Sequence, residues 1–211
     1  MTRSLGVKAW ATGAAVLVAV TACANSSSDT GPPPSPSVSP TSPGSTSPGT
    51  TSSSPASESE VASTSGEAVV RRYFVVLDDL RQDPAEPVKQ LASVATSTQL
   101  AAQRRLLTNE RDDGLHQVGT TRVAGLTVQS VNLDNSDPSV GRVPTVTVDV
   151  CWDVSGADLL DKGGRSVVSP DRASTGWTRY TVANYHWSEN PSGGWRVATS
   201  RDLKRAPCAA S

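Results

Sequence analysis

The stretch VPTVTVDVCWDV, residues 143–154, has apolar side chains at alternate positions. Because successive side chains of an extended chain point to opposite faces, a period of two predicts a β-strand with one buried face. We therefore predict a strand over 143–154 whose valines and Trp152 lie in the core. Asp149 and Asp153 fall on the other face, and we expect both to face water.

Three more segments with strand character surround this one. Residues 122–133 predict a long strand in which Gly125 marks a bulge. Residues 176–187 and 195–201 predict two further strands, and the NPSGG segment between them, residues 190–194, has the composition of a hairpin turn. The second half of the domain is therefore expected to form an antiparallel sheet of about four strands.

The segment before these strands has a helical period instead. Between residues 69 and 80, apolar side chains recur three to four positions apart, which predicts a helix ending near Gln82. Just before it, TSGE at residues 64–67 matches a capping box, in which Thr64 and Glu67 bind each other's backbone amides. We therefore place the start of this helix at Thr64–Glu67.

Two shorter helices are expected to follow. Asp83 and Pro84 have the order of an N-cap and a first helical residue, and a short helix after them would carry Leu91. Residues 97–112 predict a third helix, which Gly114 ends. Helices first and strands later indicate an α+β fold rather than an alternating α/β fold.

At the front of the chain, an apolar run ends on a cysteine. Arg3 and Lys8 precede about a dozen apolar residues, too few for a permanent membrane span and typical of an export signal. The tetrapeptide VTAC at 20–23 resembles the lipobox of bacterial lipoproteins. The resemblance implies that residues 1–22 are a signal peptide and that Cys23 carries acyl chains such as palmitate. The alternative is a plain secretory signal with a chance cysteine.

Two acyl chains on Cys23 would be enough for stable anchoring. The expected location is therefore the extracellular face of the cell membrane, with the membrane as a partner through this lipid. Residues 23–65 after the anchor consist mainly of Ser, Thr, Pro and Gly, which predicts a disordered linker, with or without O-linked sugars. Residues 66–211 are then one α+β domain.

The amino-acid composition limits the classes of partner that we expect and indicates the kind of organism that encodes the chain. The formal net charge is −1 and no basic run stands out, so we do not expect a nucleic-acid partner. The chain contains no isoleucine, and lysine is scarce beside arginine. Both amino acids have AT-rich codons, so the bias indicates a high-GC bacterium, and we expect an actinobacterium.

The chain has three cysteines, and with Cys23 assigned to lipid, Cys151 and Cys208 remain as an even pair. Such pairs are usually joined outside the cytoplasm, so we predict a disulfide, with two free thiols as the alternative. Two thiols and two distant histidines lack the spacing of a metal site. We assign no metal and no cofactor.

The order of helices and strands resembles the nuclear-transport-factor-2-like fold, a curved sheet wrapped around helices to form a cone. A closer resemblance is to uncharacterised lipoproteins of actinobacteria. It rests on CWDVSGADLLDKGGRSVVSPDR (151–172), followed by an aromatic strand, the GWRV segment (194–197) and a final cysteine, and it covers roughly 67–208. The resemblance implies a pocket between sheet and helices, in which some relatives hold an Asp or His as a general base.

No catalytic motif accompanies this resemblance. The chain has no nucleophile elbow, phosphate loop or dinucleotide-binding glycine pattern, so we assign no catalytic residue. His116 falls in a predicted loop, and the candidates for a base are weak. They are Asp149, Asp153, Tyr180, Tyr185 and His186. Four aromatic residues could line a pocket or a partner surface, core packing being the alternative for the tryptophans: Trp177, Tyr185, His186 and Trp187.

Two functions remain open at this stage. The first is a non-enzymatic domain that binds a small ligand, a protein or a cell-wall component on a flexible tether. The second is a small surface enzyme of the isomerase or dehydratase type with an Asp or His base in the cone pocket. A buried Asp or His lining a closed pocket would favour the enzyme.

Overall fold

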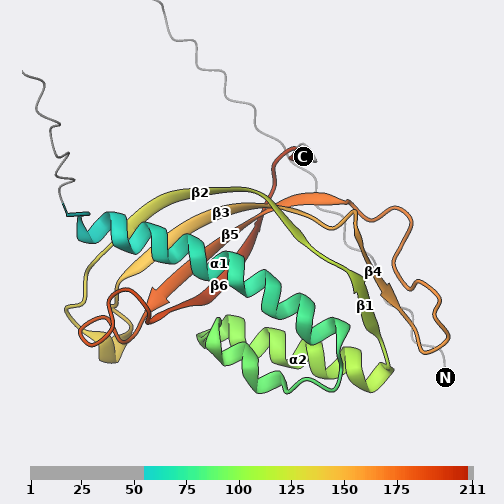
Figure 1. The fold of residues 1–211 in the computed structure, drawn as a ribbon. Helices are drawn as coiled ribbons and strands as arrows, with labels where there is room; N and C mark the ends of the chain where they lie inside the picture. Colours follow the sequence, from blue (N-terminus) through green and yellow to red (C-terminus); the bar gives the residue numbers. More distant parts are fainter. Residues whose placement is uncertain (1–54, 209–211) are drawn as a thin grey trace, which may run out of the picture. The chain divides into compact units, whose positions relative to one another are not determined.

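The structure, a computed structural model, describes residues 55–208 (Figure 1). The predicted signal peptide, Cys23 and the linker as far as residue 54 lie outside the described residues. The described part has an α+β fold, as predicted, with helices α1 (Glu58–Gln82) and α2 (Ser97–Asp113). The short 3-10 helices are η1 (Val88–Ser93) and η2 (Pro138–Val140). The strands are β1 (His116–Gly119), β2 (Arg122–Asn132), β3 (Thr145–Asp153), β4 (Ala157–Leu160), β5 (Thr175–Asn184) and β6 (Trp195–Leu203).

The main sheet is antiparallel, with strand order β2-β3-β5-β6. The opening stretch of the sequence forms its central strand β3, which pairs with β2 and β5 over its whole length. Val146, Val148 and Val150 are fully buried, as the period of two predicts. The register with β2 shifts next to Gly125, which confirms the predicted bulge.

Both α-helices cover the same face of this sheet (Figure 1). α1 runs across it and contacts all four strands, whereas α2 contacts β6 and η1. The closest approach is at Gly66, where an added Cβ would lie 3.0 Å from the Cβ of Val146. Glycine therefore lets the α1 backbone lie close to the start of β3.

The start of α1 differs from the prediction. Ser57 is the N-cap, and it forms a capping box with Glu60: the Ser57 side chain accepts from the Glu60 amide, and the Ser57 amide donates to the Glu60 carboxylate at 2.7 Å. The predicted box at Thr64–Glu67 is wrong, because both residues lie inside the helix. The last part of the predicted linker, residues 58–65, is therefore helical.

The predicted second helix also starts elsewhere. Asp83 ends α1, and its amide donates to the Asp79 carbonyl at 3.0 Å, so it is not the cap of a new helix. The following helix is the 3-10 helix η1, which begins after Pro87 and buries Leu91. α2 ends as predicted, at Gly114 with φ of 73°.

A second, two-stranded sheet was not predicted. β1 pairs antiparallel with β4, with His116 opposite Leu160, so the prediction of a loop at His116 is wrong. Gly119 ends β1 with φ of 70°, and an added Cβ would lie 1.8 Å from the Gly156 carbonyl oxygen. No helix within residues 55–208 is both long and apolar enough to cross a lipid bilayer.

Candidate functional site

A cavity of about 310 Å³ lies between α1 and the helix-covered face of the sheet. Its lining comes from α1, α2, the β1–β2 turn, β3 with the residue after it, the segment before β5, and β5 itself. The lining residues are Tyr73, Phe74, Leu77, Asp78, Arg81, Gln103, Thr121, Trp152, Val154, Arg172, Ala173 and Tyr180. Six separate segments of the chain therefore meet at this site.

Three aromatic rings form the apolar floor. The rings of Tyr73, Phe74 and Tyr180 contact one another edge to face, with centroids 5.8 to 5.9 Å apart. The Tyr73 hydroxyl accepts a hydrogen bond from Gln99 Nε2 at 2.5 Å, and burial raises the pKa of Tyr73 to about 12. Burial raises the pKa of Tyr180 as well, so both phenols are neutral at pH 7.

Trp152 forms one wall, and hydrogen bonds fix its position. Its Nε1 donates to Thr178 Oγ1 at 3.0 Å, and Thr178 Oγ1 donates to Asp202 Oδ1 at 2.8 Å. On the opposite strand, a Cβ added at Gly176 would lie 2.3 Å from Trp152 Cζ2. Only a glycine at position 176 leaves room for the indole ring in this orientation.

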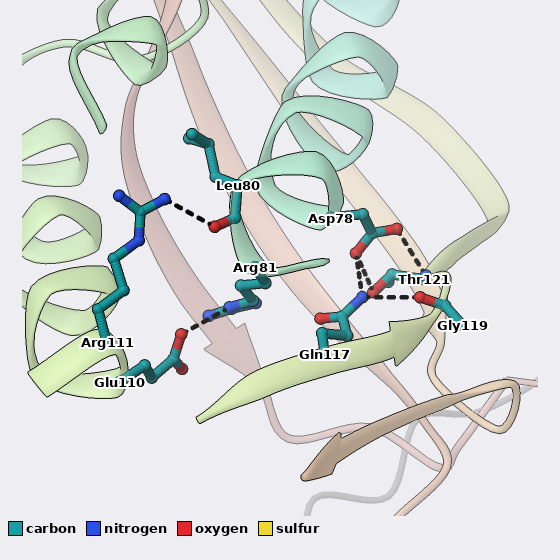
Figure 2. A network of polar contacts seen from close by, with 8 residues as sticks. All are labelled: Asp78, Leu80, Arg81, Glu110, Arg111, Gln117, Gly119 and Thr121. Carbon is teal, nitrogen blue, oxygen red and sulfur yellow. Dashed lines mark hydrogen bonds and ion pairs between the residues drawn. The ribbon is translucent and has the colours of Figure 1, made fainter. Parts of the chain in front are cut away.

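The acidic residue of the cavity is Asp78, which is 5% exposed. Figure 2 shows its carboxylate facing the β1–β2 turn. Its Oδ1 accepts from Gln117 Nε2 at 2.7 Å and from Thr121 Oγ1 at 3.0 Å, and its Oδ2 accepts from the Thr121 amide at 2.7 Å. Three donors therefore stabilise its charge and join α1 to β1, through Gln117, and to the turn between β1 and β2, through Thr121.

Two arginines flank this polar side of the cavity. Arg81 Nε lies 3.1 Å from Glu110 Oε2, an ion pair that joins α1 to α2 (Figure 2). Arg172 instead donates to two backbone carbonyls, those of Val154 at 3.1 Å and Ala157 at 2.8 Å. Both arginines also line a smaller neighbouring cavity of about 220 Å³ beside β4.

Gln103 carries an unsatisfied hydrogen-bond acceptor in the lining of the cavity. Within the described part of the chain, its Oε1 is buried and has no hydrogen-bond partner. A buried acceptor left alone costs about 1–3 kcal/mol. A bound molecule with an O–H or N–H group could compensate that cost.

Asp149 and Asp153 lie on the opposite face of the sheet, away from this cavity. The prediction that they face water is wrong, since the side chains of both are fully buried. Asp149 pairs with Arg179, at 2.6 Å, and with Arg205, whereas Asp153 pairs with Arg122. The hydrogen bond from Arg179 lowers the pKa of Asp149.

The four aromatic candidates from the sequence do not come together. Trp177 is half-buried on the outer face of the sheet, where the Arg205 guanidinium lies 5.2 Å from its ring centroid. Trp187 packs edge to face on Trp195 at 5.9 Å. Tyr185 and His186 are exposed and line a separate cavity of about 260 Å³. β5 ends at Asn184, so the predicted strand does not reach these last three candidates.

The predicted disulfide between Cys151 and Cys208 is confirmed, with Cα atoms 6.1 Å apart. It fixes the C-terminal segment to the outer face of β3, and Thr175 Oγ1 adds a hydrogen bond to the Cys208 carbonyl at 3.0 Å. Among residues 55–208, no group of three or more His, Cys, Asp or Glu side chains is placed to hold a metal ion.

No sequence pattern predicted a role in the site for four of its residues: Asp78, Gln103, Thr121 and Arg172. One signal was present for Asp78, because it lies four residues after Phe74 and so continues the apolar face of α1. A charged residue on a buried face calls for a partner or a function. The other three come from segments whose proximity only the tertiary structure shows.

No model of a known protein family matches this chain, and no curated protein matches it. Among solved structures, the chain is similar to the intermembrane space region of the chloroplast protein ARC6. The TM-score is 0.45 at 20% sequence identity, over 67% of this chain and 95% of that one. We draw no functional argument from a similarity at this level.

Proposed function

We propose that this chain is a lipoprotein on the extracellular face of an actinobacterial membrane, and that its domain, of the nuclear-transport-factor-2-like type, binds a small ligand without transforming it. Cys23 would carry the lipid, and the linker would hold the domain away from the membrane. The proposed localisation rests on the apolar run and the VTAC tetrapeptide near the N-terminus. The proposed activity rests on the cavity between α1 and the sheet.

The observation that carries the binding proposal is an aromatic cavity whose charged groups are already compensated. Its volume of about 310 Å³ lies within the range of small-molecule sites. Asp78 is held by three donors and Arg81 by Glu110. Arg172 is exposed and donates to two backbone carbonyls, so none of the three requires a charged ligand. The cavity therefore suits a neutral, largely aromatic or apolar molecule with a hydrogen-bond donor for Gln103.

An isomerase or dehydratase would need a base in the same cavity. Among the described lining residues, Asp78 is the carboxylate available. Its two oxygens hold Gln117 and Thr121, so protonation during turnover would weaken the contact between α1 and the β1–β2 turn. This geometry favours binding over catalysis.

The neutral dye N-phenyl-1-naphthylamine, which carries an N–H group and fluoresces in apolar surroundings, can test this proposal on the full chain. Ala173 lines the cavity but is itself exposed, so Ala173→Trp would fill the cavity without disturbing the core. We expect saturable dye binding that Ala173→Trp weakens about tenfold or more. The matched control is Ala101→Trp on the exposed face of α2, expected to stay within about twofold of the wild type. Equal dye affinity for both variants would contradict the proposal.

The proposed localisation can be tested separately. In an actinobacterial host, we expect wild-type protein in the membrane fraction, with an intact mass that includes diacylglycerol on Cys23. Cys23→Ser should move the protein into the medium, because the anchoring chains are lost. Cys208→Ser changes another cysteine of the same chain and should leave the protein in the membrane. Retention of Cys23→Ser in the membrane would disprove the lipid anchor.

A further inference from the structure

A second cavity, of about 290 Å³, lies beside the first half of α1. It is bounded by α1, the last residue of η1, the turn after β5 and the start of β6. It shares no lining residue with the aromatic cavity. Any ligand of this cavity would therefore be independent of the function proposed above.

Two arginines without acidic partners line this cavity, Arg72 on α1 and Arg196 on β6. The arginine ion pairs in the described part of the chain involve other residues, and neither Arg72 nor Arg196 takes part in one. None of the residues that line the cavity is acidic. Within residues 55–208, the two arginines therefore form no ion pair, and no residue of the cavity lining carries a negative charge.

The Arg196 guanidinium is held in place by backbone carbonyls. Nε donates to Ala92 at 3.2 Å, and Nη1 donates to Gly193 at 3.2 Å and to Trp195 at 2.7 Å. Nη2 has no hydrogen-bond partner among the described residues and remains available for a ligand. Burial lowers the pKa of Arg196, and repulsion from Arg72 lowers it further, so a bound anion would relieve an existing strain between like charges.

Four hydroxyl groups complete the set of donors. They belong to residues that line the cavity and whose side chains form no hydrogen bond with another described residue: Thr64, Ser65, Ser93 and Ser192. The free guanidinium of Arg72 can bind phosphate oxygens through paired N–H donors, whereas Arg196 can donate through Nη2. The hydroxyls can donate to the oxygens that remain. We propose that Arg72 and Arg196 form a binding site for the phosphoryl group of an anionic ligand.

A phosphoryl group can come from a soluble phosphate compound or from the headgroup of an anionic lipid. Calorimetric titration of the full chain with inorganic phosphate tests the first source. Cosedimentation with phosphatidylglycerol vesicles, compared with phosphatidylcholine vesicles, tests the second. Saturable binding in either arm supports the site if it depends on Arg72, and the arm that responds identifies the source.

Arg72→Gln is the decisive variant, because Arg72 is exposed and forms no hydrogen bond within residues 55–208, so the fold should be retained. Its neighbour Arg71 is also exposed but lies outside the cavity, so Arg71→Gln removes the same charge at a matched position. We expect Arg72→Gln to weaken phosphoryl binding about tenfold or more, and Arg71→Gln to weaken it less than about twofold.

The same two variants can overturn the proposal. If both weaken binding equally, the attraction is general electrostatics and no defined site exists. If the wild type binds neither inorganic phosphate nor phosphatidylglycerol vesicles in a saturable manner, the site is also disproved. Binding of N-phenyl-1-naphthylamine in the aromatic cavity should be unchanged by Arg72→Gln, so failure of one proposal is distinguishable from failure of the other.

Discussion

Asp149 and Asp153 lie on the outer face of the sheet. Arginine side chains cover both carboxylates, which are fully buried. Removing one partner of a buried ion pair leaves the other charge uncompensated, which lowers the free energy of unfolding. The loss is smaller where the arginine partner is exposed to water. Arg122, the partner of Asp153, is about half exposed, and so is Arg205 beside Asp149. The two ion-pair sites are therefore partly open to solvent. Because each pair depends on an ionised aspartate, its contribution to the free energy of unfolding should depend on pH.

Asp153 gives the clearest expectation for this pH dependence. Hydrogen bonds from Ser155 and Arg122 lower its pKa to about 2, below the value of about 3.9 for an unfolded aspartate. Between these two values the unfolded state binds more protons than the folded state, so the contribution of Asp153 is complete above about pH 4 and is lost as the pH falls toward 2. Asp153→Asn should therefore be less stable than the wild type at pH 7, with a difference that shrinks below pH 4.

Urea unfolding at a series of pH values, followed by tryptophan fluorescence, measures this difference. Asp171→Asn is the matched control, because the Asp171 side chain is exposed and forms no hydrogen bond or ion pair within the described residues. We expect it to follow the wild type at every pH. A destabilisation by Asp153→Asn that stays constant from pH 7 to pH 3 would show that the ion pair does not carry the effect.

Among the elements, those with a sustained period were predictable from the sequence. α2 and the strands β2, β3 and β6 lie close to their predicted ranges. The period is clearest in β3, where Val146, Val148 and Val150 are all fully buried on one face. β1 and β4 were missed because strands of four residues are too short to show a period. The two pair antiparallel, and Gly119 lies so close to the Gly156 carbonyl that a side chain there would clash, a tertiary contact that no local pattern reveals.

The start of α1 shows that a local signal can be genuine and still ambiguous. Near the start of α1, two segments fit a capping box, SESE at 57–60 and TSGE at 64–67. The helix uses the first and continues through Gly66, where it packs against Val146. Packing on β3 thus decides between two caps that the sequence alone leaves nearly equivalent.

The burial of Asp149 and Asp153 has a tertiary cause too. A period of two in β3 predicts that one face is wet, but the C-terminal segment returns over that face and places Arg205 and Cys208 on it. The position of the cavity also has a tertiary cause, because its lining comes from six separate segments. The sequence could therefore predict the sheet and the disulfide, whereas the partners of the buried charges and the position of the site required the folded chain.

At the scale of the whole molecule, the Cys151–Cys208 disulfide joins the end of the chain to the centre of the sheet. The two cysteines are 57 residues apart, and closing a loop of that length in the unfolded chain contributes about 4 kcal/mol on the chain-entropy description. The same bond keeps Arg205 near Asp149 and Trp177. Its loss should therefore both destabilise the fold and uncover part of the outer face.

We expect Cys208→Ser to lower the free energy of unfolding by about 2–4 kcal/mol, the lower part of the range applying if residual structure shortens the effective loop. Urea unfolding measures the loss, and tryptophan fluorescence should change as the Arg205 guanidinium leaves the Trp177 ring. Dithiothreitol should destabilise the wild type by a similar amount and leave Cys208→Ser unchanged, because only the wild type has a bond to reduce. If reduction destabilised both proteins equally, the effect would not come from this disulfide, and the ion pairs of Asp149 would have to hold the C-terminal segment by themselves.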